Sequence, residues 1–112
     1  MAVTLYHNPR CGTSRNALAL LEAQGVKLQV VDYLKTPLSR ADLDKLVQKG
    51  IAPRDLLRAK EALASELQLE NASDTKILAA IAKNPMLLNR PVVVGPRGVV
   101  AARPAERALE VL

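Results

Sequence analysis

The sequence contains very few residues that bind metals or carry aromatic rings. Its 112 residues include one Cys, one His, two Tyr, no Phe and no Trp. Zinc sites need three or four protein ligands, mostly Cys and His, so the usual zinc sites are excluded. A single Cys also excludes an internal disulfide and a CxxC dithiol pair. We expect no bound metal and no bound organic cofactor, since GxGxxG and GxxxxGK motifs are missing as well.

Two classes of partner are disfavoured by what the sequence lacks. The net charge is +5, but Lys and Arg are scattered, and aromatic residues that could stack on bases are scarce. We therefore expect no nucleic-acid partner. We also expect no membrane partner, because no apolar run approaches the roughly 20 residues that cross a bilayer. The first ten residues lack the apolar stretch of a signal peptide, so the expected location is the cytoplasm, whose reducing environment suits a lone Cys.

Hydrophobic patterning predicts one α/β domain over residues 1–112. A β-prone run, an amphipathic helix ended by Gly25 and a second β-prone run come first, and such a crossover implies parallel strands. A helical stretch follows, in which Ser39 and Asp42 form a capping-box pattern. An antiparallel hairpin and a helix after Pro104 close the chain. The expected elements are a strand at 3–6, a helix that begins after Cys11-Gly12 and ends at Gly25, and a strand at 28–33. Helices within roughly 38–88 follow, then strands at 91–94 and 99–102, and a helix from 104 with Ala105, Ala108 and Leu109 on one face. This is the order of a thioredoxin-like fold (β-α-β … β-β-α) with a helical insert between its second and third strands.

Cys11 lies between the end of the first expected strand and the start of the first expected helix. The free amides and the dipole at a helix N-terminus bind anions and lower the pKa of a thiol. The residues that follow add backbone freedom, two hydroxyls and a positive charge: Gly12, Thr13, Ser14 and Arg15. A buried structural Cys is the alternative, because free Cys is often buried. The composition of the loop favours a thiolate nucleophile in an anion-binding loop.

His7 and Asn8 precede the Cys11 loop. His7 can lower the pKa of the Cys11 thiol when protonated, or donate a hydrogen bond to it. A strand-end His bonded to the backbone is the alternative, and it is the better supported of the two on the residue type alone. Asn8 is expected to hold the loop through an Asx turn rather than to take part in chemistry.

Three arginines stand where a loop meets a helix or strand, namely Arg58, Arg90 and Arg103. The planar guanidinium matches tetrahedral oxyanions and keeps its charge. Taken singly, each is more often a solvated surface residue. Arg90 is the most suggestive of the three, because Arg90-Pro91 opens the third strand, beside the first helix. Pro91 can be cis, although only about 5–6% of X-Pro bonds are.

The decapeptide HNPRCGTSRN, residues 7–16, closely resembles the glutaredoxin-linked arsenate reductase family (ArsC type). The resemblance continues, in order, through nearly the whole chain. Its further segments are Asp32–Pro37, Leu56–Arg58, Asn84-Pro85, Asn89–Val94 and Arg103-Pro104. After Arg58 the sequence reads Ala59-Lys60-Glu61, which is nearer to the short branch of the family, and the longer C-terminal tail of its best-known members is missing.

The resemblance implies a role for each matched residue. Cys11 matches the catalytic cysteine of the family, and His7 matches a motif His that supports a low thiol pKa. Pro91 matches a proline that is usually cis. The oxyanion-binding arginines of the family are matched by Arg58, Arg90 and Arg103. The family fold is thioredoxin-like with a helical insert, which agrees with the element order inferred from the residues.

The implied activity is arsenate reduction, as used in arsenic detoxification. The Cys11 thiolate attacks arsenic and displaces water or hydroxide while the arginines and the loop amides hold the oxyanion. A lone Cys cannot finish a redox cycle, so glutathione is expected to attack the adduct and glutaredoxin to resolve the mixed disulfide. Two alternatives stay open. One is another thiol oxidoreductase on this fold with a different oxidised substrate, and the other is a non-enzymatic adaptor that regulates RNA polymerase.

Overall fold

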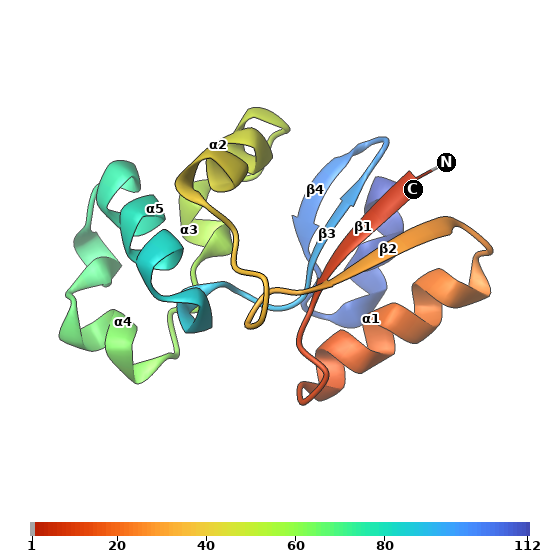
Figure 1. The fold of residues 1–112 in the computed structure, drawn as a ribbon, viewed down its shortest axis with the longest axis horizontal. Helices are drawn as coiled ribbons and strands as arrows, with labels where there is room; N and C mark the ends of the chain where they lie inside the picture. Colours follow the sequence, from red (N-terminus) through yellow and green to blue (C-terminus); the bar gives the residue numbers. More distant parts are fainter. Residues whose placement is uncertain (1) are drawn as a thin grey trace.

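The computed structural model describes residues 2–112 and contains a four-stranded mixed sheet (Figure 1). Its strands are β1 (Ala2–His7), β2 (Lys27–Asp32), β3 (Val92–Gly95) and β4 (Gly98–Ala101), in the spatial order β2-β1-β3-β4. β1 and β2 run parallel, whereas β3 pairs antiparallel with both β1 and β4. The predicted parallel crossover and the predicted hairpin are both confirmed.

One face of the sheet is covered by α1 (Gly12–Ala23) and the 3-10 helix η3 (Ala105–Val111) (Figure 1). Strand residues that point to this face, such as Leu5 and Val93, form an apolar core with Ala17 and Ala108. Gly25 follows α1 with a φ of +68°, a conformation that favours glycine, so the predicted helix end is confirmed.

The final helix differs from its prediction. Its buried residues are Ala105, Ala108 and Val111, which are spaced by three and therefore match a 3-10 helix with three residues per turn. Leu109, which was expected on the packed face, is 37% exposed. The prediction applied α-helical spacing to a segment whose apolar period is shorter.

The helical insert lies between β2 and β3, as predicted, and occupies its own side of the molecule (Figure 1). Ser39 and Asp42 form the predicted capping box at the start of α2 (Arg40–Gln48), and the Ser73 side chain caps α5 (Asp74–Lys83) by accepting the N–H of Lys76. The helices are α2 (Arg40–Gln48), α3 (Pro53–Leu56), α4 (Ala62–Glu66), η1 (Leu69–Asn71), α5 (Asp74–Lys83) and η2 (Pro85–Leu87). Within residues 2–112, no helix is long and apolar enough to cross a membrane.

A second apolar core joins the insert to the other face of the sheet. Val92 and Ala101 of the sheet pack there with insert residues such as Leu43 and Ile77. Tyr33, which follows β2 and is fully buried, belongs to the same core. The insert therefore has a fixed position beside the strands that carry the candidate site.

Candidate active site

The register of the sheet brings three distant parts of the chain together at one end of the central strands β1 and β3. Tyr6 near the end of β1 pairs with Val92 at the start of β3, so the loop after β1 lies beside Arg90. The N–H of Ala102 donates to the carbonyl of Pro91 at 2.9 Å, which brings the segment after β4 to the same place. Cys11, Arg90 and Arg103 therefore lie close together at this end of the sheet.

The Cys11 thiol is partly exposed and faces a guanidinium. Nη1 of Arg103 lies 3.8 Å from Sγ of Cys11, and the same nitrogen donates to the carbonyl of Arg90 at 2.9 Å. The second contact orients the guanidinium toward the thiol. Cys11 is the N-cap residue of α1, and the first turn of that helix has no acidic side chain. The positive end of the helix dipole therefore acts on the sulfur without an opposing charge from that turn.

The surroundings of Cys11 favour the thiolate. Partial burial is the largest single effect and by itself raises the pKa of the Cys11 thiol. Hydrogen bonds from the backbone amide of Ser14, the Arg103 guanidinium, the backbone amide of Thr13 and the Arg90 side chain together outweigh it. The net result is a pKa below the ordinary value, as expected for a thiol that acts as a nucleophile.

His7 does not interact with the thiol in the way that the sequence suggested. Its side chain is buried, and Nδ1 lies 2.6 Å from Oγ of Ser14. Burial lowers the pKa of His7; Asp32 opposes this and Arg15 adds to it. A neutral His7 adds no positive charge beside Cys11. Oγ of Ser14 also accepts the N–H of Asn8 at 3.0 Å, so His7 and Ser14 together hold the loop.

Asn8 organises the loop as expected, and it also has a partner that the sequence did not reveal. Its Oδ1 accepts the N–H of Arg10 at 3.0 Å, which is the Asx-type bond, and its carbonyl accepts the N–H of Cys11 at 3.0 Å. Its Nδ2 donates to the hydroxyl of Tyr33 at 3.4 Å. Tyr33 is one of two aromatic residues in the chain. This scarcity was the one feature of the sequence that could have drawn attention to the hydrogen bond of its hydroxyl.

Arg15 and Gly12 lie on the outer side of the loop, and both are exposed. Nη1 of Arg15 donates to the carbonyl of Pro9 at 3.0 Å, so its guanidinium folds back over the loop. A Cβ at Gly12 would lie 3.8 Å from Nη2 of Arg15. Arg15 thus places a positive charge close to the loop, and its hydrogen bond is made to a backbone carbonyl of the loop.

Arg58 reaches this region from the insert. Its N–H donates to the carbonyl of Leu87 at 2.7 Å, and Leu57 forms an antiparallel bridge with Leu88. These bonds hold Arg58 next to the segment that leads to Arg90. Nε of Arg58 lies 3.6 Å from Oε2 of Glu61, which is an ion-pair distance that exceeds a hydrogen bond.

Two of the three candidate arginines carry an unsatisfied donor. The Nε atoms of Arg58 and Arg90 are both buried and have no hydrogen-bond partner within residues 2–112. Buried donors of this kind are unusual, and a bound anion is one way to satisfy them. The Arg90–Pro91 peptide is cis, as the resemblance implies, and the Arg103–Pro104 peptide is cis as well.

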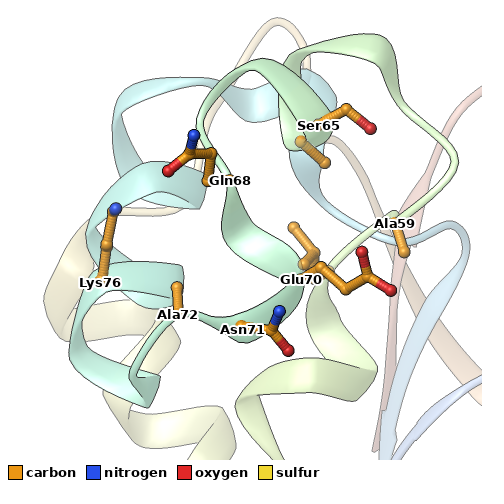
Figure 2. Close-up of a pocket in the computed structure, with 9 residues that line it drawn as sticks. Ala59, Ser65, Gln68, Glu70, Asn71, Ala72 and Lys76 are labelled. Atoms are coloured by element: carbon orange, nitrogen blue, oxygen red, sulfur yellow. The ribbon is translucent and has the colours of Figure 1, made fainter.

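One hollow of the insert lies apart from the thiol. It has a volume of about 670 Å³ and opens between α4, η1 and the start of α5, with Ser65, Gln68, Glu70 and Lys76 at its rim (Figure 2). Leu57 and Ala59, on either side of Arg58, also line it. The residues that line this hollow belong to the insert, whereas Cys11 lies at the end of the sheet, after β1.

Comparisons with known proteins agree with this architecture. An arsenate reductase from Rhizobium meliloti is 44% identical over 115 aligned residues, covering 100% of this chain and 82% of that protein. The Escherichia coli arsenate reductase is 42% identical, covering 98% of this chain and 80% of its own. The solved structure of an arsenate reductase from Vibrio cholerae superimposes with a TM-score of 0.91 at 44% identity, covering 100% of this chain and 98% of that one. The fold is therefore thioredoxin-like. The model of the ArsC family matches residues 6–111, and the chain belongs to the ArsC family.

Proposed function

We propose that the protein is an arsenate reductase that uses Cys11 as its nucleophile. The observation that carries this proposal is the position of the thiol, which sits at the N-terminus of α1 with a guanidinium nitrogen of Arg103 at 3.8 Å. Its pKa is lowered by amides and guanidinium groups, which are the same donors that bind an oxyanion. The two relatives described above, each more than 40% identical, are named arsenate reductases.

Arg90, Arg103 and Arg58 are proposed to hold the oxyanion. Arg90 and Arg103 lie near the thiol, and Arg58 is held beside the same segment by its backbone. The unsatisfied Nε atoms of Arg58 and Arg90 give the anion two further donors. Gly12, Thr13, Ser14 and Arg15 complete the binding loop, in which the amides of Thr13 and Ser14 already donate to the sulfur.

The proposed reaction has three chemical steps. In the first, the thiolate forms an S–As bond with arsenate, and one arsenate hydroxyl takes up a proton and leaves as water. The thiolate of glutathione then bonds to Sγ of Cys11, and the S–As bond breaks with its electron pair on arsenic. This step releases arsenite and leaves a Cys11–glutathione disulfide, which a second thiol, delivered through glutaredoxin, reduces back to the Cys11 thiol.

The dependence on external thiols rests on the single Cys of the sequence. No second Cys is present to form an internal disulfide with Cys11, so both electrons must come from thiols outside the chain. Glutathione and glutaredoxin supply thiols of this kind in a reducing compartment. We accordingly place the activity in the cytoplasm.

A coupled assay tests the proposal. NADPH oxidation is followed with arsenate, glutathione, glutathione reductase and glutaredoxin, for the wild type and for Cys11→Ser. We expect arsenate-dependent oxidation from the wild type and none from the variant. Omitting glutathione should abolish the signal. A wild type that oxidises no NADPH in response to arsenate, while it reduces another oxidised thiol substrate, would replace arsenate reduction with a different thiol oxidoreductase activity.

A further inference from the structure

A second hollow is lined in part by Arg103, the residue whose guanidinium faces the thiol. It has a volume of about 320 Å³, near the lower end of the roughly 300–1,000 Å³ that is common for small-molecule sites. Arg103 belongs to both places, because it lines the hollow and its Nη1 lies 3.8 Å from Sγ of Cys11. A molecule in this hollow would therefore contact the same residue that faces the thiol.

The charged side chains of this hollow are three arginines and one aspartate. Arg54 is held in place by donating to the carbonyls of Glu70 and Ala72, each at 2.6 Å. Arg107 is exposed, and only its Nε pairs with Glu110, at 3.3 Å, so its terminal nitrogens stay available. Arg103 and Asp55 complete the charged set. The lining is thus positive overall, with one negative group on its α3 side.

The hollow also offers a strand edge. Val99, Val100 and Ala101 of β4 line it, and β4 is the last strand of the sheet, with β3 as its neighbour on one side. Along the other side, the described part of the chain supplies no further strand. Such an edge can pair with the backbone of a short peptide.

We propose that this hollow binds the thiol that regenerates Cys11, and that this thiol is a small anionic peptide of the glutathione class. The inference rests on the proposed function. Glutathione carries two carboxylates and one ammonium group, which complement the three arginines and Asp55. Its peptide groups suit the edge of β4. Its glycine carboxylate lies one residue from the cysteine, a reach of roughly 3.5 Å, and its glutamyl carboxylate lies farther away along a side chain. A peptide anchored in the hollow by these groups can extend its thiol past Arg103 toward Cys11.

Binding of S-methylglutathione, whose sulfur cannot react, tests the hollow without turnover. It is titrated into the isotope-labelled wild-type protein, and the amide shifts of residues 97–107 are followed by NMR. Arg107→Ala should weaken binding by up to about fivefold, the upper end of the usual range for an exposed ion pair. Esterifying both carboxylates of S-methylglutathione should weaken its binding to the wild type and to Arg107→Ala, and the loss of affinity should be larger for the wild type. The matched control is Arg40→Ala, because Arg40 also forms an exposed ion pair, with Asp44 at 3.0 Å, but on α2.

The kinetic arm measures the same variants in the arsenate assay. We expect Arg107→Ala to raise the apparent KM for glutathione by a similar factor and to leave the KM for arsenate unchanged. An affinity for S-methylglutathione that is equal in the wild type, Arg107→Ala and Arg40→Ala would overturn the inference and leave the proposed function intact. A rise in the KM for arsenate alone would also overturn it, since the hollow would then belong to the oxyanion site. If arsenate turnover is absent while binding still depends on Arg107, the proposed function fails and the hollow remains a peptide-thiol site.

Discussion

The chemistry of single residues at this site depends on which groups point at the sulfur of Cys11. Backbone amides of Ser14 and Thr13 come from its own loop, whereas the Arg103 and Arg90 guanidinium groups come from the far end of the sequence. These donors outweigh the effect of burial and lower the pKa of the thiol. They also form the surroundings that a tetrahedral oxyanion needs, so one set of residues both activates the nucleophile and binds its substrate.

Arg103→Ala tests this double role. The variant loses a charged donor at the thiol, which is worth about 1.5–3 kcal/mol when it bonds an anion, so the KM for arsenate should rise by about tenfold or more. The pKa of the Cys11 thiol should rise as well. Steady-state kinetics and the pH dependence of thiol alkylation measure the two effects. The control is Arg97→Ala, an exposed arginine in the β3–β4 turn, and a KM for arsenate that is equal in the two variants would remove Arg103 from the site.

The lowered pKa of His7 predicts that the stability of the protein depends on pH. Burial lowers its pKa, so the unfolded chain takes up a proton near pH 6.5 while the folded chain does so only at lower pH. Acid therefore favours the unfolded state, and the free energy of unfolding should fall between pH 7.5 and 5.5. The fall is at most about 1.4 kcal/mol per pH unit below 6.5.

Urea unfolding of Cys11→Ser with and without His7→Gln measures this contribution. The Cys11→Ser background removes titration of the thiol, and His7 is the one His of the chain, so the difference between the two proteins reports its protonation. We expect the decrease to be smaller in the variant. Equal slopes in both proteins would show that His7 is not held in its neutral form.

The sequence indicated candidate residues for the site more readily than it indicated the contacts of those residues. Cys11 could be inferred from local order, because a strand end, a Gly-Thr-Ser run and a helix start stand next to one another. The meeting of Arg90 and Arg103 with Cys11 depends on sheet register between distant segments, and only the family resemblance implied it. The bond from His7 to Ser14 depends on burial, which residue type alone does not reveal.

The helices and strands show the same division between local and distant causes. The capping box at Ser39 was predictable because it needs only two residues three positions apart. The prediction for the final helix was wrong in helix type, because the spacing of its buried residues follows from the packing of Ala105, Ala108 and Val111 against α1 and the sheet. The several helices expected in the insert include two short ones, since α3 has four residues and α4 has five.

Ser39→Ala tests whether the cap stabilises the insert. Oγ of Ser39 accepts the N–H of Asp42 at 3.1 Å, and the Asp42 side chain accepts the N–H of Ser39 at 3.0 Å. Loss of this bond should lower the free energy of unfolding by about 1 kcal/mol, as measured by urea unfolding. Ser65→Ala is the control, because Ser65 is an exposed residue within α4, where Ala is a better helix former. Equal stability of the two variants would contradict the capping role.

At the scale of the whole molecule, the candidate site lies where two apolar cores meet. One core joins the sheet to α1 and η3, and the other joins it to the insert. The Cys11 loop is attached to the first core through Ala17, and Arg58 comes from the second, next to Leu57. Arg90 leads into β3, whose residues Val92 and Val93 point into different cores. The positions of the Cys11 loop, Arg90 and Arg58 therefore depend on packing in both cores.

The pKa of Cys11 in the folded and unfolded protein tests this account most directly. The rate of alkylation by iodoacetamide is measured against pH for the wild type in buffer and in denaturing urea. The account predicts a lower pKa in the folded protein than in the unfolded chain, where the thiol should titrate near its free value of about 8.5, because the amides and guanidinium groups then leave the sulfur. A folded-state pKa equal to or above that of the unfolded chain would contradict the claim that this fold makes Cys11 a thiolate nucleophile.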